Sequence, residues 1–455
     1  MSRTQQVLAQ LRAYESRNVV FAEADGSWPI VWERARGVHV WDAEGKKYLD
    51  LTAAFGVAAA GHANPRVVRA GQQQMAKLLH AMGDVHPHAL KAQLARELGR
   101  ITFERWTKPP RTTGKTIFCN SGFEAVEAAL KTAFLATGKP GVIAFHGAYH
   151  GLGYGALNAT HRDFFRGPFR GQLAEFGHFV PFPAQRAAGI LPAGRARGPA
   201  DKMSAAPSPE LSRIISSLRG LFRQNRIGAI LVEPIQARGG INIPPPEFLP
   251  LLRQLCDEHG ALLILDEIYT GFGRTGKWFA CEHTRTVPDL ICLGKALTGG
   301  FPLSACVGRA DLMDAAWPAS TGEAIHTSTF LGHPVGCAMT LAQIAEIKAQ
   351  KLVERSARLG DFLRRELEGI FNLQSPISNS RGLGLMAGLE LLRPDGSPAT
   401  ALALQAIKSM LHRGFILLPE GEHANIISFT PPLTITERQL HSTLAALRDV
   451  LAEPV

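Results

Sequence analysis

The central part of the chain alternates short, continuously apolar runs with longer segments of helical periodicity. Strands that are apolar on both faces are typical of parallel sheets, whose crossover connections are usually helices. The pattern therefore predicts an α/β fold with a mostly parallel sheet covered by helices. The predicted strands are residues 115–120, 141–147, 227–234, 261–267 and 289–295, and the predicted helices include residues 121–138 and 248–260.

The two ends of the chain differ from this pattern and predict a second, smaller α+β domain. Two strand-like pieces flank a turn at residues 42–45, which is typical of a hairpin. We expect the small domain to combine residues 1–60 with residues 336–455, and the large domain to span residues 61–335. A Pro-, Ala- and Gly-rich stretch at residues 185–212 is expected to form an exposed insertion. In the C-terminal part, helices are expected at residues 337–350 and 352–370, and strands at residues 384–392 and 425–433.

The 455-residue chain has 45% hydrophobic and 19% charged residues, an ordinary globular composition. No apolar run approaches the roughly 20 residues that cross a bilayer, and the polar segment Met1–Val20 lacks the apolar centre of a signal peptide. The six cysteines have no CxxC spacing and are expected to be reduced and buried. The net charge of +10 is not gathered in a basic block. We therefore expect a cytoplasmic protein that binds no metal, membrane or nucleic acid.

Two charged residues stand at the ends of predicted strands, where an open α/β sheet binds its ligand. They are Asp266, in ALLILDE, and Lys295, which ends DLICLGK. A lysine desolvated in a cleft has a lowered pKa and becomes a nucleophilic amine that forms Schiff bases. An aspartate that faces a heterocyclic nitrogen keeps this nitrogen protonated and makes the ring an electron sink. Taken singly, each residue is more often a member of a structural ion pair.

Other residues suit the phosphate and the ring of a cofactor. Ser121 and Gly122 stand between a strand and a helix, and a helix N-terminus binds anions; a simple serine N-cap is an equally good interpretation. Ser328 and Thr329 add hydroxyl groups, and Tyr149 is an aromatic residue that either stacks on a planar ring or belongs to the core. The GFGRTG segment matches a dinucleotide-binding pattern, but no clear helix follows it, so this interpretation is rejected.

Longer segments carry a more specific signal than any single residue. They are WDAEGKKYLD, GHANP, NSGFEAVEAALK, FHGAYHG, VEPIQ, LLILDEIYTGFGRTG, LGKALTGGFPLSA, HTSTFLGHP, RGLGLMAGLEL and TPPLTIT, and they run from about residue 41 to residue 436. In these segments, and in their order along the sequence, the chain resembles the class III (fold type I) pyridoxal 5'-phosphate (PLP) aminotransferases. That family includes the ornithine, acetylornithine and 4-aminobutyrate aminotransferases. The resemblance implies the fold type I PLP-transferase architecture, with pyridoxal 5'-phosphate as the cofactor.

The resemblance also implies roles for individual residues around the cofactor. Lys295 is expected to form the Schiff base and to carry the proton, and Asp266 to pair with the pyridine nitrogen. Ile268 and Tyr149 are expected on opposite faces of the ring, with Gln236 near the ring hydroxyl. The other cofactor-binding residues that the family motifs imply are Glu233 and, for the phosphate, Ser121, Gly122, Ser328 and Thr329, with Thr329 supplied by the partner subunit of a homodimer.

On the substrate side the sequence departs from its family. Arg381 is expected to clamp the substrate carboxylate, because its planar fork suits bidentate binding. The ornithine and 4-aminobutyrate enzymes resemble each other in a Glu that pairs with this arginine. Arg238 stands at that position here, so Arg381 is expected to lack a neutralising partner. We therefore hypothesise that the site holds a carboxylate persistently and favours α-amino acids or acidic substrates. Arg238 and Phe55 are also expected to contact the substrate. Phe123 beside the phosphate, and Ser428 where many relatives carry Arg, are further departures.

The function predicted from these residues is transamination with ping-pong chemistry, in a homodimer with shared active sites. Its partners are expected to be small-molecule amino and oxo substrates. Two alternatives stay open: a racemase or epimerase of the same family, which returns the proton to the opposite face, and a non-catalytic binding protein on the same fold. The presence of both Asp266 and Lys295 argues against the second alternative.

Overall fold

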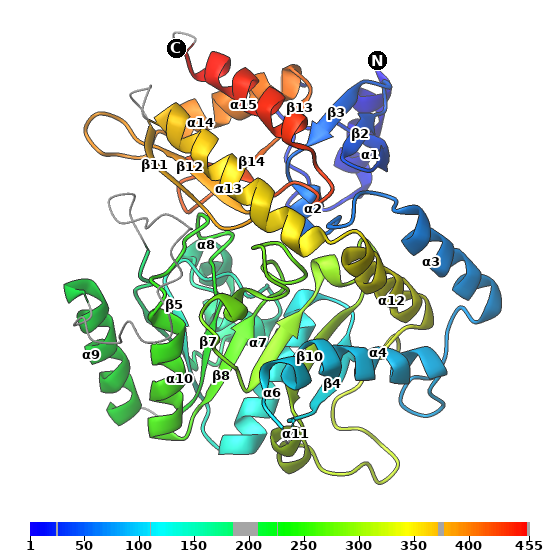
Figure 1. Ribbon diagram of the computed structural model, residues 1–455, viewed down its shortest axis with the longest axis vertical. Helices are drawn as coiled ribbons and strands as arrows, with labels where there is room; N and C mark the ends of the chain where they lie inside the picture. Colours follow the sequence, from blue (N-terminus) through cyan, green and yellow to red (C-terminus); the bar gives the residue numbers. More distant parts are fainter. Residues whose placement is uncertain (24–25, 110, 185–207, 225, 372–376, 453–455) are drawn as a thin grey trace.

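The computed structural model describes residues 1–23, 26–109, 111–184, 208–224, 226–371 and 377–452 of the chain (Figure 1). Within the described residues, a seven-stranded sheet forms the centre of the molecule, in the order β4-β10-β9-β8-β7-β5-β6. Strand β10 is antiparallel to both of its neighbours, and the other neighbouring pairs are parallel. The predicted mostly parallel sheet is therefore confirmed. Its strands are β4 (Gly114–Cys119), β5 (Gly141–Phe145), β6 (Gly177–Val180), β7 (Ile227–Val232), β8 (Leu262–Asp266), β9 (Leu290–Leu293) and β10 (Ser304–Arg309).

Helices cover both faces of this sheet. Along β7, Ala229 and Leu231 belong to an apolar cluster that includes helix α6 (Gly122–Thr137), whereas Ile230 and Val232 belong to the larger cluster that includes α10 (Phe248–His259). Successive residues of a strand point to opposite faces, so a strand covered on both faces, such as β7, has apolar residues at successive positions. This arrangement explains the continuous apolar runs of the sequence. Helices α4 (Ala89–Ile101) and α9 (Pro209–Gln224) also contribute to the larger cluster.

Two smaller sheets lie at the end of the molecule that carries both termini (Figure 1). One has the order β1-β2-β3-β13 and includes the hairpin predicted around residues 42–45. In it, β13 pairs parallel with β3, which joins the C-terminal part of the chain to the N-terminal part. The other sheet is antiparallel, in the order β11-β12-β15-β14. The strands are β1 (Trp32–Arg36), β2 (His39–Asp42), β3 (Lys47–Asp50), β11 (Ile377–Gly382), β12 (Ala387–Leu391), β13 (Phe415–Ile416), β14 (Leu418–Glu420) and β15 (Ile426–Phe429).

The remaining helices connect or cover these sheets. Helix α12 packs against α3 and α4, and α13 packs against α15 and β11. The helices whose bounds have not been given above are α1 (Arg3–Tyr14), α2 (Ala53–Gly56), α3 (Pro65–Lys77), α5 (Phe103–Trp106), α7 (Tyr154–Leu157), α8 (Asp163–Arg166), α11 (Ala310–Ala316), α12 (Pro334–Ala349), α13 (Leu352–Phe371), α14 (Thr400–His412) and α15 (Glu437–Ala452), with short 3-10 helices η1 (Gly167–Gln172), η3 (Ala280–His283) and η4 (Lys295–Leu297).

The predicted domain limits at residues 60 and 335 stay a prediction, although the seven-stranded sheet lies between them and both smaller sheets lie outside them. Residues 185–207 of the predicted insertion lie outside the described residues. Its last residues, from Pro209, begin helix α9, where Leu211 is buried, so the insertion ends earlier than expected. All six cysteines are buried free thiols. Within the described ranges, no helix is long and apolar enough to cross a membrane.

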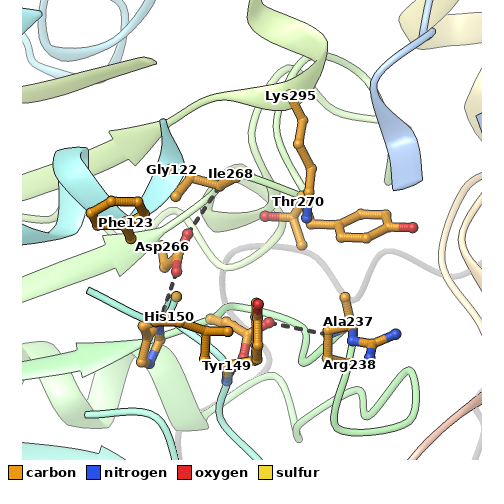
Figure 2. Close-up of a pocket in the computed structure, with 14 residues that line it drawn as sticks. Gly122, Phe123, Tyr149, His150, Ala237, Arg238, Asp266, Ile268, Thr270 and Lys295 are labelled. Atoms are coloured by element: carbon orange, nitrogen blue, oxygen red, sulfur yellow. Dashed lines mark hydrogen bonds and ion pairs between the residues drawn. The ribbon is translucent and has the colours of Figure 1, made fainter. Parts of the chain in front are cut away.

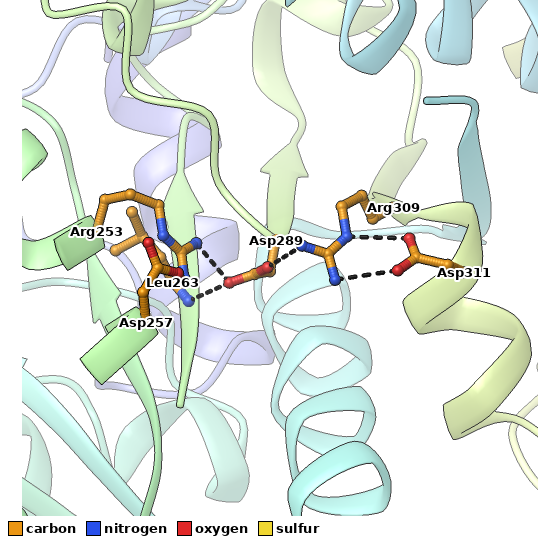
Figure 3. Close-up of polar contacts among 6 residues, drawn as sticks. All are labelled: Arg253, Asp257, Leu263, Asp289, Arg309 and Asp311. Atoms are coloured by element: carbon orange, nitrogen blue, oxygen red, sulfur yellow. Dashed lines mark hydrogen bonds and ion pairs between the residues drawn. The ribbon is translucent and has the colours of Figure 1, made fainter. Parts of the chain in front are cut away.

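A buried carboxylate connects several elements of the large sheet at the edge where β8 and β9 begin (Figure 3). Asp289 Oδ2 accepts hydrogen bonds from Arg253 Nη1 of α10 at 2.6 Å and from the backbone N–H of Leu263 at 2.8 Å. Its Oδ1 accepts from Arg309 Nη1 of β10 at 3.0 Å. The Asp289 side chain is only 3% exposed. Three donors from different elements therefore stabilise one buried charge.

Replacing Asp289 with alanine is expected to lower the free energy of unfolding by about 3 kcal/mol, because two arginines and a buried N–H lose their acceptor. Asp311→Ala is the matched control, since Asp311 also binds Arg309 but its side chain is 68% exposed. The control is expected to cost less than about 1 kcal/mol. Denaturant unfolding followed by circular dichroism measures both variants, and equal losses would contradict the importance of the buried carboxylate.

Candidate active site

The parallel strands β4, β5, β7, β8 and β9 end at one edge of the central sheet, where an open α/β sheet binds its ligand. A cavity of about 440 Å³ lies at this edge (Figure 2). Residues that directly follow these strands supply most of its walls. The described residues that line it are Gly122, Phe123, Tyr149, His150, Gly151, Leu152, Glu233, Ala237, Arg238, Asp266, Ile268, Tyr269, Thr270 and Lys295.

Asp266 is the last residue of β8, and its carboxylate is held by two donors. His150 Nδ1 donates to Asp266 Oδ2 at 2.8 Å, and the backbone N–H of Ile268 donates to Oδ1 at 3.1 Å. Both Asp266 and His150 are buried. Because a carboxylate accepts hydrogen bonds and donates none, the contact places the proton of His150 on Nδ1. The two donors fix the direction in which the carboxylate faces the cavity.

Lys295 follows β9 after Gly294 and begins the short helix η4. Its φ of 45° lies in the left-handed region, a strained conformation that is common at functional sites. The side chain extends into the cavity (Figure 2), and its Nζ lies 3.8 Å from the ring centre of Tyr269. Burial lowers the pKa of Lys295 to about 8, against the opposing effect of Asp266, Glu233 and Glu420. A lysine with this pKa is a far better nucleophile near neutral pH than an exposed lysine.

The N-terminus of the 16-residue helix α6 faces the same cavity. Ser121 precedes Gly122 and is not itself among the described residues that line the cavity; its Oγ is buried and has no hydrogen-bond partner among the described residues. A Cβ on Gly122 would lie 3.1 Å from Ile268 Cδ1, so the absence of a side chain leaves the first turn of the helix open to a ligand. Glu124 binds the backbone N–H groups of Asn120 and Ser121. An unpaired hydroxyl at a helix N-terminus suits a phosphate group.

Tyr149 and Ile268 lie on opposite sides of the Asp266 carboxylate (Figure 2). Glu233 fixes the segment that carries Tyr149: its carboxylate accepts the backbone N–H groups of Tyr149 at 3.1 Å and Ala237 at 3.2 Å. Burial raises the pKa of Glu233 to about 7. Glu233 therefore connects the loops after β5 and β7 and holds both against the cavity.

Arg238 lines the cavity on the side of the C-terminal sheet. Its Nη1 lies 3.2 Å from Oε2 of Glu420, at the end of β14, and its guanidinium lies 5.9 Å from the Tyr149 ring. The carbonyl oxygen of Arg238 accepts hydrogen bonds from Arg162 Nη2 at 2.9 Å and from the backbone N–H of Gly421 at 3.2 Å. Both the side chain and the backbone of Arg238 thus contact the segment that contains Glu420.

Several residues predicted at the site lie outside the cavity walls. Gln236 is buried with its amide in use, donating to the His146 carbonyl at 2.8 Å and accepting from Asn242 at 3.1 Å. Ser328 accepts a hydrogen bond from Asn120 Nδ2 at 3.2 Å, close to the start of α6. Thr329 is exposed, and Phe55 is half exposed, and neither belongs to the described residues that line the cavity. The roles predicted for them stay predictions.

Arg381 is buried in β11 and is also not among the described residues that line the cavity. Its Nη1 donates to Glu390 Oε2 at 2.7 Å. The expectation that Arg381 lacks a neutralising partner is therefore wrong, because Glu390 supplies the charge on the neighbouring strand. The other nitrogens donate to the carbonyls of Gly240 and Ile241 and to the side chain of Asn242.

The departures from the family pattern are accommodated locally. Phe123 lines the cavity, and a Cβ on Gly151 would lie 2.4 Å from the Phe123 Cβ. Glycine at position 151, with a φ of 110°, therefore makes room for the large side chain. Ser428 is buried, and its Oγ donates to the Leu418 carbonyl between neighbouring strands at 3.0 Å.

The sequence-based prediction missed His150, Tyr269, Thr270 and Glu420. His150 could have been predicted from the sequence, because it belongs to the same FHGAYHG segment as Tyr149. Tyr269 and Thr270 follow Asp266 in the chain, but the residues alone do not tell which of them face the cavity. Glu420 comes from a different sheet, and no local pattern connects it with Arg238.

Comparison with known proteins agrees with this arrangement. Residues 20–451 match the class III aminotransferase family. A 5-aminovalerate aminotransferase (DavT) of Pseudomonas aeruginosa is 36% identical over 429 residues, 93% of this chain and 94% of the relative. An acetylornithine aminotransferase of Methanosarcina mazei is 35% identical over 422 residues, 93% of this chain and 92% of the relative.

Solved structures show the same similarity. An ornithine aminotransferase of Toxoplasma gondii, described with partial occupancy of PLP at its active site, has a TM-score of 0.81 and 26% identity, covering 99% of this chain and 94% of that chain. An (S)-enantioselective omega-transaminase of Thermomicrobium roseum has a TM-score of 0.85 and 27% identity, covering 98% of this chain and 99% of that chain.

The fold and the cavity define an α/β enzyme with a reactive lysine beside a buried carboxylate. The chain belongs to the class III aminotransferase family. It is a PLP-dependent enzyme that catalyses transamination. The unpaired Ser121 hydroxyl, the amine of Lys295 and the fixed carboxylate of Asp266 fit the phosphate, the aldehyde and the ring nitrogen of that cofactor. The racemase alternative has no support among the relatives and structures described above, which are all named as aminotransferases or transaminases.

The coupling of the cofactor-free protein to added pyridoxal phosphate is expected to accelerate with rising pH, with a midpoint near the Lys295 pKa of about 8. The lowered pKa leaves the amine neutral, and therefore nucleophilic, above this value. Borohydride reduction followed by peptide mass analysis measures the extent of coupling at Lys295. In Asp266→Asn the midpoint is expected to move to lower pH, because the carboxylate favours the ammonium form. A wild-type midpoint at the ordinary lysine value of about 10.4 would contradict the expectation.

Proposed function

We propose that Lys295 and Asp266 are the catalytic residues of this aminotransferase, and that the chain acts as a homodimer on amino acids and oxo acids that carry a carboxylate. One observation carries the proposal: the amine of Lys295 and the fixed carboxylate of Asp266 line one cavity, beside a helix N-terminus with an unpaired hydroxyl. Each group suits a different part of the same cofactor.

Bound pyridoxal phosphate supplies an electron sink, which stabilises negative charge that develops on the substrate carbon. Asp266, oriented by His150 and by the backbone N–H of Ile268, would hold the proton of the ring nitrogen. Tyr149 and Ile268, which lie on opposite sides of the Asp266 carboxylate, would confine the ring. Ser121 Oγ and the N-terminus of α6 would bind the phosphate. Lys295 Nζ would take the proton from the α-carbon of the amino donor and pass it on in the 1,3-shift that distinguishes transamination from racemisation.

A donor panel tests this proposal. Glutamate, ornithine, 4-aminobutyrate, acetylornithine and 5-aminovalerate, each supplied with an oxo-acid acceptor, are scored for oxo product and for loss of optical activity. We expect oxo product from at least one donor, no racemisation without transfer, and a loss of at least a thousandfold in Lys295→Ala, which removes both the nucleophile and the proton carrier. Lys139→Ala, remote from the cavity, is the control. Racemisation without oxo product would replace the proposal with the racemase.

The homodimer is supported by exposed apolar side chains on two segments, residues 75–85 and residues 325–330. The segments that carry them touch each other, since Thr327 Oγ1 donates to Asp84 Oδ2 at 2.6 Å and the rings of His80 and Phe330 lie 5.4 Å apart. Ser328 connects the second segment to Asn120, at the start of α6. An apolar patch of this kind marks a protein interface. Its residues are Met75, Leu78, Leu79, Met82, Val85, Ile325 and Phe330.

We further propose that Thr329 acts at the phosphate of the partner subunit, and mixed dimers test this point. Lys295→Ala and Thr329→Glu are each expected to be inactive, the second because its carboxylate repels the phosphate. Refolding the two variants together restores one intact site in each mixed dimer, or about a quarter of the wild-type activity for random pairing. If Thr329 served its own subunit, mixing would restore nothing. Thr329→Ser, which keeps the hydroxyl, is the control.

A further inference from the structure

Two arginines close to the site differ in the capacity that they have left to bind a substrate. Arg381 is 6% exposed, and each of its three nitrogens already has a partner. The shortest of these contacts join it to the Gly240 carbonyl at 2.6 Å and to Glu390 at 2.7 Å. A substrate carboxylate would have to displace Glu390 and the backbone carbonyls together. Arg381 therefore holds β11 against β12 and the loop after β7.

Arg238 is in the opposite position. It lines the cavity, its side chain is 33% exposed, and within the described residues its guanidinium has one ion-pair partner, Glu420, at 3.2 Å. Only Nη1 takes part in that contact. The planar guanidinium has five N–H donors, so most of its hydrogen-bonding capacity is open to a ligand.

Glu420 keeps this arginine in place without using it fully. Its side chain is 3% exposed, and burial raises the pKa of Glu420 while the neighbouring charges of Arg238, Lys295 and Arg162 oppose that change. The backbone of Arg238 is held separately, by Arg162 Nη2 and by the N–H of Gly421. The side chain can therefore exchange partners while its backbone stays fixed, which is the arrangement required of a preorganised binding group.

We propose that Arg238, rather than Arg381, binds the carboxylate of the amino and oxo substrates, and that Glu420 is the resting partner with which the incoming carboxylate competes for the guanidinium. The proposal rests on the proposed function, because it assigns the substrate side of the same cavity. The ligand class is a small carboxylate-bearing amino acid or oxo acid. Arg238 binds it through two parallel N–H donors in the fork geometry that carboxylates prefer.

Calorimetric titration of the holoenzyme with glutarate tests the proposal, because glutarate has carboxylates but no amino or keto group and cannot react. Arg238→Gln is expected to weaken glutarate binding at least tenfold, since a charge-assisted pair is lost. Glu420→Gln is expected to strengthen binding at least threefold, because the competing carboxylate is removed. Arg219→Gln, a surface change in α9, is the matched control and leaves the affinity within twofold.

The opposite signs separate a binding role from a merely structural ion pair. If Glu420→Gln weakened binding as much as Arg238→Gln, the pair would only support the fold and the proposal would be overturned. A greater loss in Arg381→Lys than in Arg238→Lys would return the role to Arg381. Thermal unfolding of each variant checks folding, and if Arg238→Gln does not fold, Glu420→Gln and the two lysine variants decide. Glutarate binding that follows these expectations, with no transamination from any donor, would contradict the proposed function alone.

Discussion

Charge at the carboxyl edge of a buried parallel sheet costs free energy, and the rest of the site depends on how that cost is met. Asp266 keeps its position because His150 and the backbone N–H of Ile268 donate to its two oxygens. The buried carboxylate of Glu233 is stabilised in the same way, because it accepts hydrogen bonds from the backbone N–H groups of Tyr149 and Ala237. Lys295 is surrounded by these carboxylates but pairs with none of them within the part of the chain that the structure describes, and its Nζ lies over the Tyr269 ring instead. The amine thus stays reactive while its neighbours are fixed.

The two edges of the central sheet carry different tasks. At the edge where β8 and β9 begin, Asp289 is saturated by two arginines and a backbone N–H, and it binds the elements to one another. At the other edge, polar groups are only partly satisfied: Ser121 Oγ and His150 Nε2 are buried without partners among the described residues. Such atoms also occur elsewhere in the described residues, Arg253 Nε beside Asp289 among them. The two at this edge differ in their position, because His150 lines the cavity and Ser121 precedes Gly122, which also lines it.

Much of the fold followed from local pattern, because the apolar runs of β5, β7, β8 and β9 are continuous and each ends in polar residues. Strand β10 was missed, because Ser304, Gly308 and Arg309 interrupt its apolar pattern. Strand ends also placed Asp266 and Lys295 correctly at one cavity. Contacts between distant segments could not be predicted: His150 is 116 residues from Asp266, and Arg238 is 182 residues from Glu420. The partner of Arg381 was missed for a related reason, since pairing Glu390 with it requires the register of β11 and β12.

The two hydrogen bonds to the carbonyl oxygen of Arg238 have a mechanical consequence. Gly421 belongs to the segment that follows β14, so its N–H fastens the C-terminal sheet to the loop after β7 independently of the Arg238 side chain. Loss of the contact with Glu420 therefore leaves the two segments joined. In the proposed binding step, the Arg238 side chain changes its partner by rotation while the backbone contacts with Arg162 and Gly421 persist. At this position the side chain of Arg238 is free to change its partner, whereas its backbone is fixed between two parts of the chain.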